Sequence, residues 1–124
     1  MEQRLTRYLQ AISAAGAQTG GQIARLEVEN RQDEANLEKV RRNVLEIFTA
    51  LANADAAEAR KDADPRQAFD RLHTRRLQQF PEPWRQKLQR AAAHGDVVAQ
   101  TIEQTKLDTV ERIRALFTET EADV

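Results

Sequence analysis

Polar side chains within and beside the apolar stripes of two amphipathic segments form the best candidate for a ligand site in this sequence. In the first segment, RLEVENRQDEANLEKV (25–40), Asn30 and Asp33 fill positions at which the helical spacing predicts apolar residues. Lys106 does the same in a second segment near the C-terminus. Two such helices packed side by side would bring the polar groups into one central layer. The predicted layer consists of Glu27, Asn30, Asp33, Glu34, Glu103 and Lys106.

This polar layer has two interpretations. Its carboxylates, amide and ammonium group could bind a small polar ligand or a metal ion in a pocket between the helices. Alternatively, the layer fixes the register of the packed helices or contacts water, because a charge buried without a partner would cost several kcal/mol. We favour the structural interpretation, since structural polar layers perturb charges in the same way as active sites do.

Residues for other catalytic chemistry are scarce. The chain contains no cysteine and two histidines, which removes disulfides, thiolate metal sites and cysteine nucleophiles. Asp70 and His73 come nearest to the Glu-x-x-His turn of carboxylate-bridged metal sites, but a single turn on a half-buried helix favours a packed histidine over a metal ligand. Gly20 and Gly21 lack the glycine spacing and the lysine of a phosphate loop. We expect no catalytic residue, no cofactor and no metal site.

Nucleic-acid binding is the first alternative function. Residues 60–95 carry nine Lys or Arg against four acidic residues, and Trp84 lies among them. The candidate phosphate contacts over residues 66–90 are Arg71, Arg75, Arg76, Arg85, Lys87 and Arg90. The whole chain, however, has 19 basic and 20 acidic residues, so no strong net field attracts nucleic acid. We favour a solvated helix face that pairs with the acidic remainder of the chain.

The elements that must position these residues are helices. Apolar residues at helical spacing over 3–15 predict a short first helix that ends at the glycines of residues 16–21. A long second helix is expected from about 20 to 53, with Thr19 as its N-cap and with Asn30 and Asp33 near its centre. Its length would be roughly 50 Å. The stretch 54–63 has no apolar side chain larger than alanine and is predicted to be a linker or a frayed helix end.

The second half of the chain predicts a proline-broken helix pair and a long C-terminal helix. Asp64–Pro65 is typical of a helix start, and the helix that follows must stop at Pro81–Glu82–Pro83. A helix over about 83–93 is expected to end at Gly95, and Asp96 is placed to cap the last helix. No strand pattern occurs. We therefore expect one all-α domain over 1–124, an irregular four- or five-helix bundle with a frayed tail at 119–124.

Composition agrees with a folded, soluble chain. Hydrophobic residues make up 40% and charged residues 31% of the 124 positions, which is typical of globular proteins. No apolar run approaches the length of a membrane span, and the first residues do not resemble a signal peptide. Together with the lack of cysteine, these features predict a cytoplasmic location.

Three segments resemble small all-helical bacterial proteins of uncharacterised families: DEANLEKVRRNVLEIF (33–48), PEPWRQKLQRAAAHGD (81–96) and IEQTKLDTVERIRALF (102–117). The resemblance covers about two thirds of the chain. It implies a helical fold and transfers no activity and no functional residue.

Large apolar side chains outside the stripes point toward protein contacts. Val28, Leu45 and Leu107 fall outside the predicted buried faces, so they either touch the shorter helices or belong to an interface. A very long helix in a small domain also leaves flank uncovered, which favours homo-oligomerisation. We therefore expect an interaction or assembly protein without catalytic activity, which binds itself or another protein. Nucleic-acid binding and a polar ligand pocket remain the two alternatives.

Overall fold

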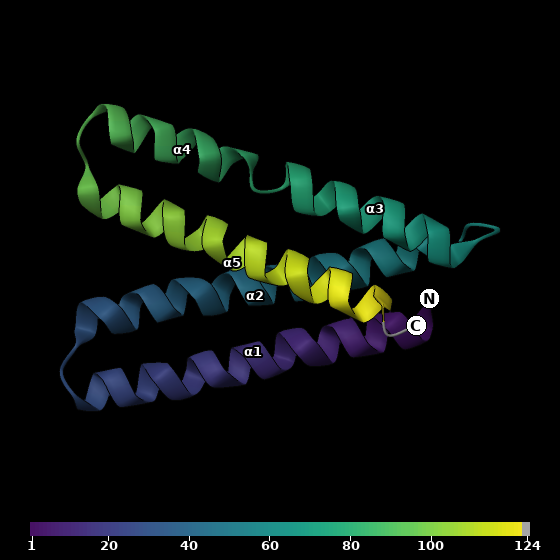
Figure 1. Cartoon of the computed structure of the whole chain (residues 1–124), viewed down its shortest axis with the longest axis horizontal. Coiled ribbons are helices and arrows are strands. Elements are labelled where there is room, and N and C mark those ends of the chain that lie inside the picture. The colour runs from purple at the N-terminus through teal and green to yellow at the C-terminus, as the bar shows by residue number, and fades with distance from the viewer. Residues whose placement is uncertain (123–124) are drawn as a thin grey trace.

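The computed structural model describes residues 1–122, and within them it contains helices and no strands, which confirms the all-α prediction. The five helices are α1 (Glu2–Val28), α2 (Gln32–Ala59), α3 (Pro65–Gln79), α4 (Glu82–Ala93) and α5 (Val97–Ala122). Figure 1 shows two antiparallel hairpins, one of α1 and α2, the other of the broken rod α3–α4 and of α5. The hairpins pack together near the chain termini and diverge toward their turns. We call these regions the closed end and the open end.

The first helix is much longer than predicted. Instead of ending near residue 15, α1 continues through Gly16, Gly20 and Gly21 to Val28. Each glycine weakens a helix by roughly 0.5–1 kcal/mol relative to alanine. The buried stripe nevertheless continues across them through Ala15, Thr19 and others, so burial outweighs the local preference. Thr19 is accordingly no N-cap, and its hydroxyl donates to the Ala15 carbonyl.

The predicted helix over 20–53 is wrong, because the chain reverses direction at Asn30. Asn30 has a φ of 59°, in the left-handed region that asparagine tolerates better than most residues. The Asn30 amide donates to the Glu27 carbonyl, and the Arg31 amide donates to the Leu26 carbonyl. This bond pair is the Schellman ending of a helix. The turn therefore separates α1 from α2, although the apolar spacing of the sequence continues in phase across it.

The predicted linker over 54–63 is wrong in its first half. Helix α2 runs to Ala59, and Asp55, Ala56 and Ala59 are buried in it. Alanines at these positions let neighbouring helices approach closely, so the lack of larger apolar side chains reflects tight packing rather than disorder. The connection to α3 lies within residues 60–64.

Residues 119–122 are helical, where a frayed tail was predicted. Helix α5 includes residues 119–122, and Thr120 is buried with its hydroxyl bonded to the Leu116 carbonyl. The frayed tail was expected over 119–124, of which residues 123 and 124 lie outside the described part.

The caps predicted at Asp64 and Asp96 and the proline break are confirmed. The Asp64 carboxylate accepts from the Gln67 amide, and the Asp96 carboxylate accepts from the Ala99 amide. Gly95 has a φ of 66° and ends α4 with the same bond pattern as Asn30 ends α1. Figure 1 shows both of these turns at the open end.

The hydrophobic core fills the closed end. Its largest members include Tyr8 of α1, Phe48 of α2, Phe69 of α3 and Phe117 of α5. The apolar stripe of α5 is therefore buried only in its second half. Val110, Ile113 and Phe117 are buried, whereas Ile102 is half-buried and Val98 is 71% exposed.

Candidate functional site at the open end

The predicted central polar layer does not form, because its members lie at the open end or pair locally. Asn30 occupies the turn, and Asp33 is exposed in the first turn of α2. Neither contacts Lys106 through a hydrogen bond or ion pair in the part of the chain that the structure describes. The premise of two long helices neutralising each other at their midpoints is therefore wrong.

The remaining members make separate ion pairs. Glu27 pairs with Lys39 across the α1–α2 hairpin at 3.0 Å, and Glu34 pairs with Arg31 in the turn. Glu103 and Lys106 pair with each other on α5 at 3.2 Å. The structure thus brings together two of the six predicted residues, Glu103 and Lys106, in one contact.

The Glu103–Lys106 pair is the only partly buried remnant of that prediction among residues 1–122. The Lys106 ammonium lies 5.5 Å from the centroid of the Trp84 ring on α4, which is within cation–π range. The second carboxylate oxygen of Glu103 is buried without a hydrogen-bond partner. These groups fasten α4 to α5, and no cluster of three metal-ligating side chains occurs within residues 1–122.

An apolar cavity of about 320 Å³ lies between the two hairpins at the open end. It is lined by Leu37 and its neighbours Asp33 and Asn36 on α2, and by residues 97–102 on α5. The α5 side chains in the lining are Val97, Val98, Thr101 and Ile102. Two hairpins in full contact would bury these side chains against each other. Because the hairpins diverge, no facing helix covers these apolar side chains of α2 and α5.

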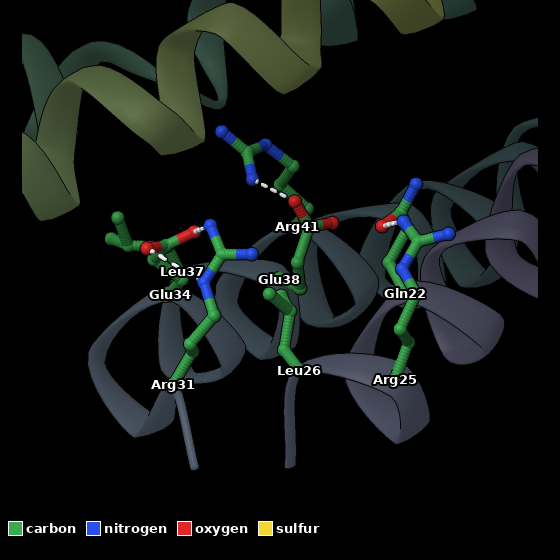
Figure 2. A pocket seen from close by; sticks show the side chains of 8 residues that line it. All are labelled: Gln22, Arg25, Leu26, Arg31, Glu34, Leu37, Glu38 and Arg41. Carbon is green, nitrogen blue, oxygen red and sulfur yellow. Dashed lines mark hydrogen bonds and ion pairs between the residues drawn. The ribbon is translucent and has the colours of Figure 1, made fainter. Parts of the chain in front are cut away.

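A second cavity, of about 370 Å³, adjoins Leu37 and has a polar lining. Figure 2 shows its three arginines engaged: Arg25 with Gln22, Arg31 with Glu34, and Arg41 with Glu38. Leu26 and Leu37 form the apolar part of its wall. Arg31 and Arg41 are paired with carboxylates within the hairpin, whereas Arg25 is bonded only to the uncharged Gln22 amide.

The most exposed large apolar side chains also lie at the open end. Val28, at the end of α1, is 84% exposed, and Val97 and Val98, at the start of α5, are 69% and 71% exposed. Of the three residues that the sequence left outside its stripes, Leu45 is buried in the core and Leu107 is half-buried, so Val28 is the one available for a protein contact.

A buried polar network at the closed end escaped the sequence analysis. The Tyr8 hydroxyl lies 2.7 Å from Nε2 of His73, and Nδ1 of His73 lies 2.9 Å from the Asp55 carboxylate. Arg76 completes the chain with a 2.8 Å bond to the other oxygen of Asp55. Four helical side chains from α1, α2 and α3 are thus joined in one line.

The protonation states of this network follow from burial. Burial lowers the pKa of His73 below its ordinary 6.5, although the adjacent Asp55 carboxylate acts in the opposite direction. Burial also raises the pKa of the Tyr8 hydroxyl. His73 is therefore neutral, with Nδ1–H donating to Asp55 and Nε2 accepting from the Tyr8 hydroxyl.

The phenol–imidazole–carboxylate order resembles a catalytic triad, but its position excludes that role. Tyr8 and His73 are both completely buried among Phe48, Phe69 and Phe117. A nucleophile must reach its substrate, and neither Tyr8 nor His73 has any exposed surface. The network positions helices, as predicted for a packed His73. The available signal was the four-residue spacing of Phe69, His73 and Leu77 on one buried stripe.

The predicted basic surface is partly neutralised. Arg76 bonds to Asp55, Arg85 pairs with Glu82, and Arg71 lies 3.9 Å from Asp62. Arg75, Lys87 and Arg90 make no ion pair within residues 1–122. The free cations therefore include two on α4, Lys87 and Arg90, near the open end.

No protein family, curated protein or solved structure matches this chain. The structure itself defines the chain as an all-α bundle of two diverging helical hairpins. No helix within residues 1–122 combines the length and apolar character that crossing a membrane requires.

Proposed function

We propose that this protein is a non-catalytic helical interaction protein whose binding surface is the open end of the bundle. The observation that carries the proposal is the apolar cavity between the hairpins, bordered by the exposed Val97 and Val98. Apolar side chains that stay in water forgo roughly 25 cal/mol of stabilisation for each Å² left uncovered. A partner that covered them would recover that free energy as binding.

The shape of the open end indicates what kind of surface it accepts. Leu37 on α2 and Ile102 on α5 face a common cavity from two diverging helices. A helix or a helical hairpin that presents one apolar side chain per turn would fit between such walls. Asp33 and Asn36 on the cavity edge would contact the polar flank of that partner.

The closed end supports the same function by keeping the hairpins fixed. The Tyr8–His73–Asp55 network joins three helices, and the aromatic core surrounds it. A rigid base lets the open end present its apolar walls without collapsing on itself, which lowers the entropic cost of binding. The lack of cysteine supports a reducing, cytoplasmic setting for this role.

A pair of fluorescent labels tests the proposal. Because the chain has no cysteine, Val98→Cys and Ala57→Cys each create one labelling site for an environment-sensitive dye. Val98 borders the cavity, and Ala57 is exposed on α2 toward the closed end. Raising the protein concentration, or adding an amphipathic leucine-rich helical peptide, should shift the emission of the Val98→Cys label to shorter wavelength. The Ala57→Cys label should not respond, and identical behaviour of both labels would contradict the proposal.

A further inference from the structure

The turn between α1 and α2 and the helix α4 on the other hairpin carry opposite charge. The segment 27–34, which we call the acidic turn, has four acidic residues and one arginine. Helix α4, on the other hairpin, has three basic residues and one acidic residue. Some of these charges have no ion-pair partner within residues 1–122, namely those of Asp33, Lys87 and Arg90.

Apolar groups accompany both charged surfaces. Val28 projects from the acidic turn with 84% of its surface exposed, and the cavity bordered by Val97 and Val98 lies between that hairpin and α5. One molecule therefore holds a protruding apolar side chain on an acidic turn. It also holds an apolar cavity between α2 and α5, and the basic helix α4 ends at the turn that leads into Val97.

We infer that the partner of the open end is a second copy of this chain, in a two-fold symmetric dimer. This inference rests on the proposed function. Val28 of each copy enters the cavity between α2 and α5 of the other, and the acidic turn of each lies against α4 of the other. Such an arrangement is self-complementary, because the two-fold rotation that places the first copy's turn on the second copy's α4 also places the second copy's turn on the first copy's α4.

The surface available is sufficient for such a dimer. A stable interface takes about 800 Å² from each partner, which is roughly a tenth of this molecule's 7272 Å². The open end holds the cavity and the three most exposed valines of residues 1–122, Val28, Val97 and Val98. A nucleic acid bound to Lys87 and Arg90 would leave Val28, Val97 and Val98 uncovered, so a second copy accounts for more of the surface.

Sedimentation velocity tests the dimer with the unlabelled chain. Between about 1 and 200 µM the wild type should shift from monomer to dimer. Val28→Asp and Val98→Asp should each raise the dimer Kd at least tenfold, because a carboxylate would enter an apolar contact. Ala57→Asp, an exposed apolar-to-acidic change on α2 toward the closed end, should leave the Kd unchanged.

Charge reversal tests the pairing of the acidic turn with α4. The variant Lys87→Glu/Arg90→Glu and the variant Glu29→Lys/Asp33→Lys should each self-associate at least tenfold more weakly than wild type. An equimolar mixture of the two should recover a heterodimer, because both of its charged contacts are then complementary: the unaltered acidic turn meets the unaltered α4, and the reversed turn meets the reversed α4. Separate monomers in that mixture would overturn the inference.

The outcomes separate the inference from the proposed function. A wild type that stays monomeric throughout overturns the dimer, and so does a dimer insensitive to both Val28→Asp and Val98→Asp. If the Val98→Cys label still responds to the helical peptide, the proposed interaction role stands without self-association. If neither label nor sedimentation responds, both fail. Salt-sensitive RNA binding by the monomer that Lys87→Glu/Arg90→Glu abolishes would overturn the inference and assign α4 to nucleic acid.

Discussion

The Nε2 atom of His73 lies 2.7 Å from the Tyr8 hydroxyl, which joins α3 to α1 across a separation of 65 residues. Both side chains are completely buried, so neither polar group can bond to water, and each takes the other as its hydrogen-bond partner. The opposite ring nitrogen of His73 is held by Asp55. The contact therefore fixes the imidazole at both nitrogens and orients three helices at the closed end.

Removing the hydroxyl should destabilise the fold without changing its shape. Tyr8→Phe leaves Nε2 of His73 buried without a donor, and we expect the free energy of unfolding to fall by about 1–2 kcal/mol. Urea denaturation measures this change. Thr74→Val alters an exposed hydroxyl on the same helix as His73 and should stay within about 0.5 kcal/mol of wild type. Equal effects of the two substitutions would show that the Tyr8–His73 bond contributes nothing.

The same network predicts a pH dependence of stability. The pKa of His73 is lowered in the folded state, chiefly by burial, so protonation favours the unfolded chain. The contribution is complete above the unfolded value of 6.5 and is lost as the pH falls from there toward the lower folded pKa. Stability should therefore decrease as the pH falls from neutral through 6.5 toward the folded pKa.

Two histidine variants isolate this effect from the titration of carboxylates. His73→Gln should flatten the decrease in urea midpoint over that pH range, whereas His94→Gln, at an exposed position after α4, should keep it. A wild-type decrease that His73→Gln leaves unaltered would assign the pH dependence to other groups.

The two turns at the open end give a prediction about backbone conformation. Gly95 has a φ of 66° and Asn30 a φ of 59°. Gly95→Ala and Asn30→Val should each lower the free energy of unfolding by about 1–2 kcal/mol, because the left-handed region disfavours the Cβ that alanine adds and, more strongly, the branched Cβ of valine. Gly21→Ala should raise it by about 0.5–1 kcal/mol, since Gly21 lies inside α1 and an added Cβ there meets nothing within 4 Å. Thermal unfolding of the three variants measures both signs.

The sequence predicted those features of the fold that one residue type marks by itself. Asp64 and Asp96 are caps, Gly95 ends α4, and the prolines at 81 and 83 break the rod. Asn30 gave no comparable signal, because the apolar stripe stays in phase on both sides of it. Glycines in α1 gave a false signal, because the helix is held by tertiary burial rather than by local preference.

The candidate site was harder to predict than the fold. Whether Ile102 and Val98 are covered depends on the angle between the two hairpins. The periodicity of the sequence shows which face of a helix is apolar, but it does not show which helix covers that face. Val28 outside the predicted stripes was the one useful signal. The pairing of Tyr8 with His73 could not be inferred, since it joins positions from different helices.

Substitutions at Arg4 can separate the contribution of its charge to stability from the contribution of its packing. Its side chain is 2% exposed, donates to Asp70 at 3.0 Å and to the Phe117 carbonyl at 3.3 Å, and stacks 3.9 Å above the Phe117 ring. Its Nε atom is buried without a partner. Desolvating this charge offsets much of what the ion pair contributes, and Asp70, 45% exposed, would be hydrated if released.

Arg4→Met keeps an apolar stem over Phe117 and should change the free energy of unfolding by less than about 1 kcal/mol. Arg4→Ala removes the stem as well and should cost about 2–3 kcal/mol, because it leaves a cavity beside the core. Arg112→Met, at an exposed position of α5, controls for the loss of one positive charge. If Arg4→Met were as destabilising as Arg4→Ala, the charge of Arg4 rather than its packing would hold α1 against α5. Urea denaturation of the three variants distinguishes these two roles.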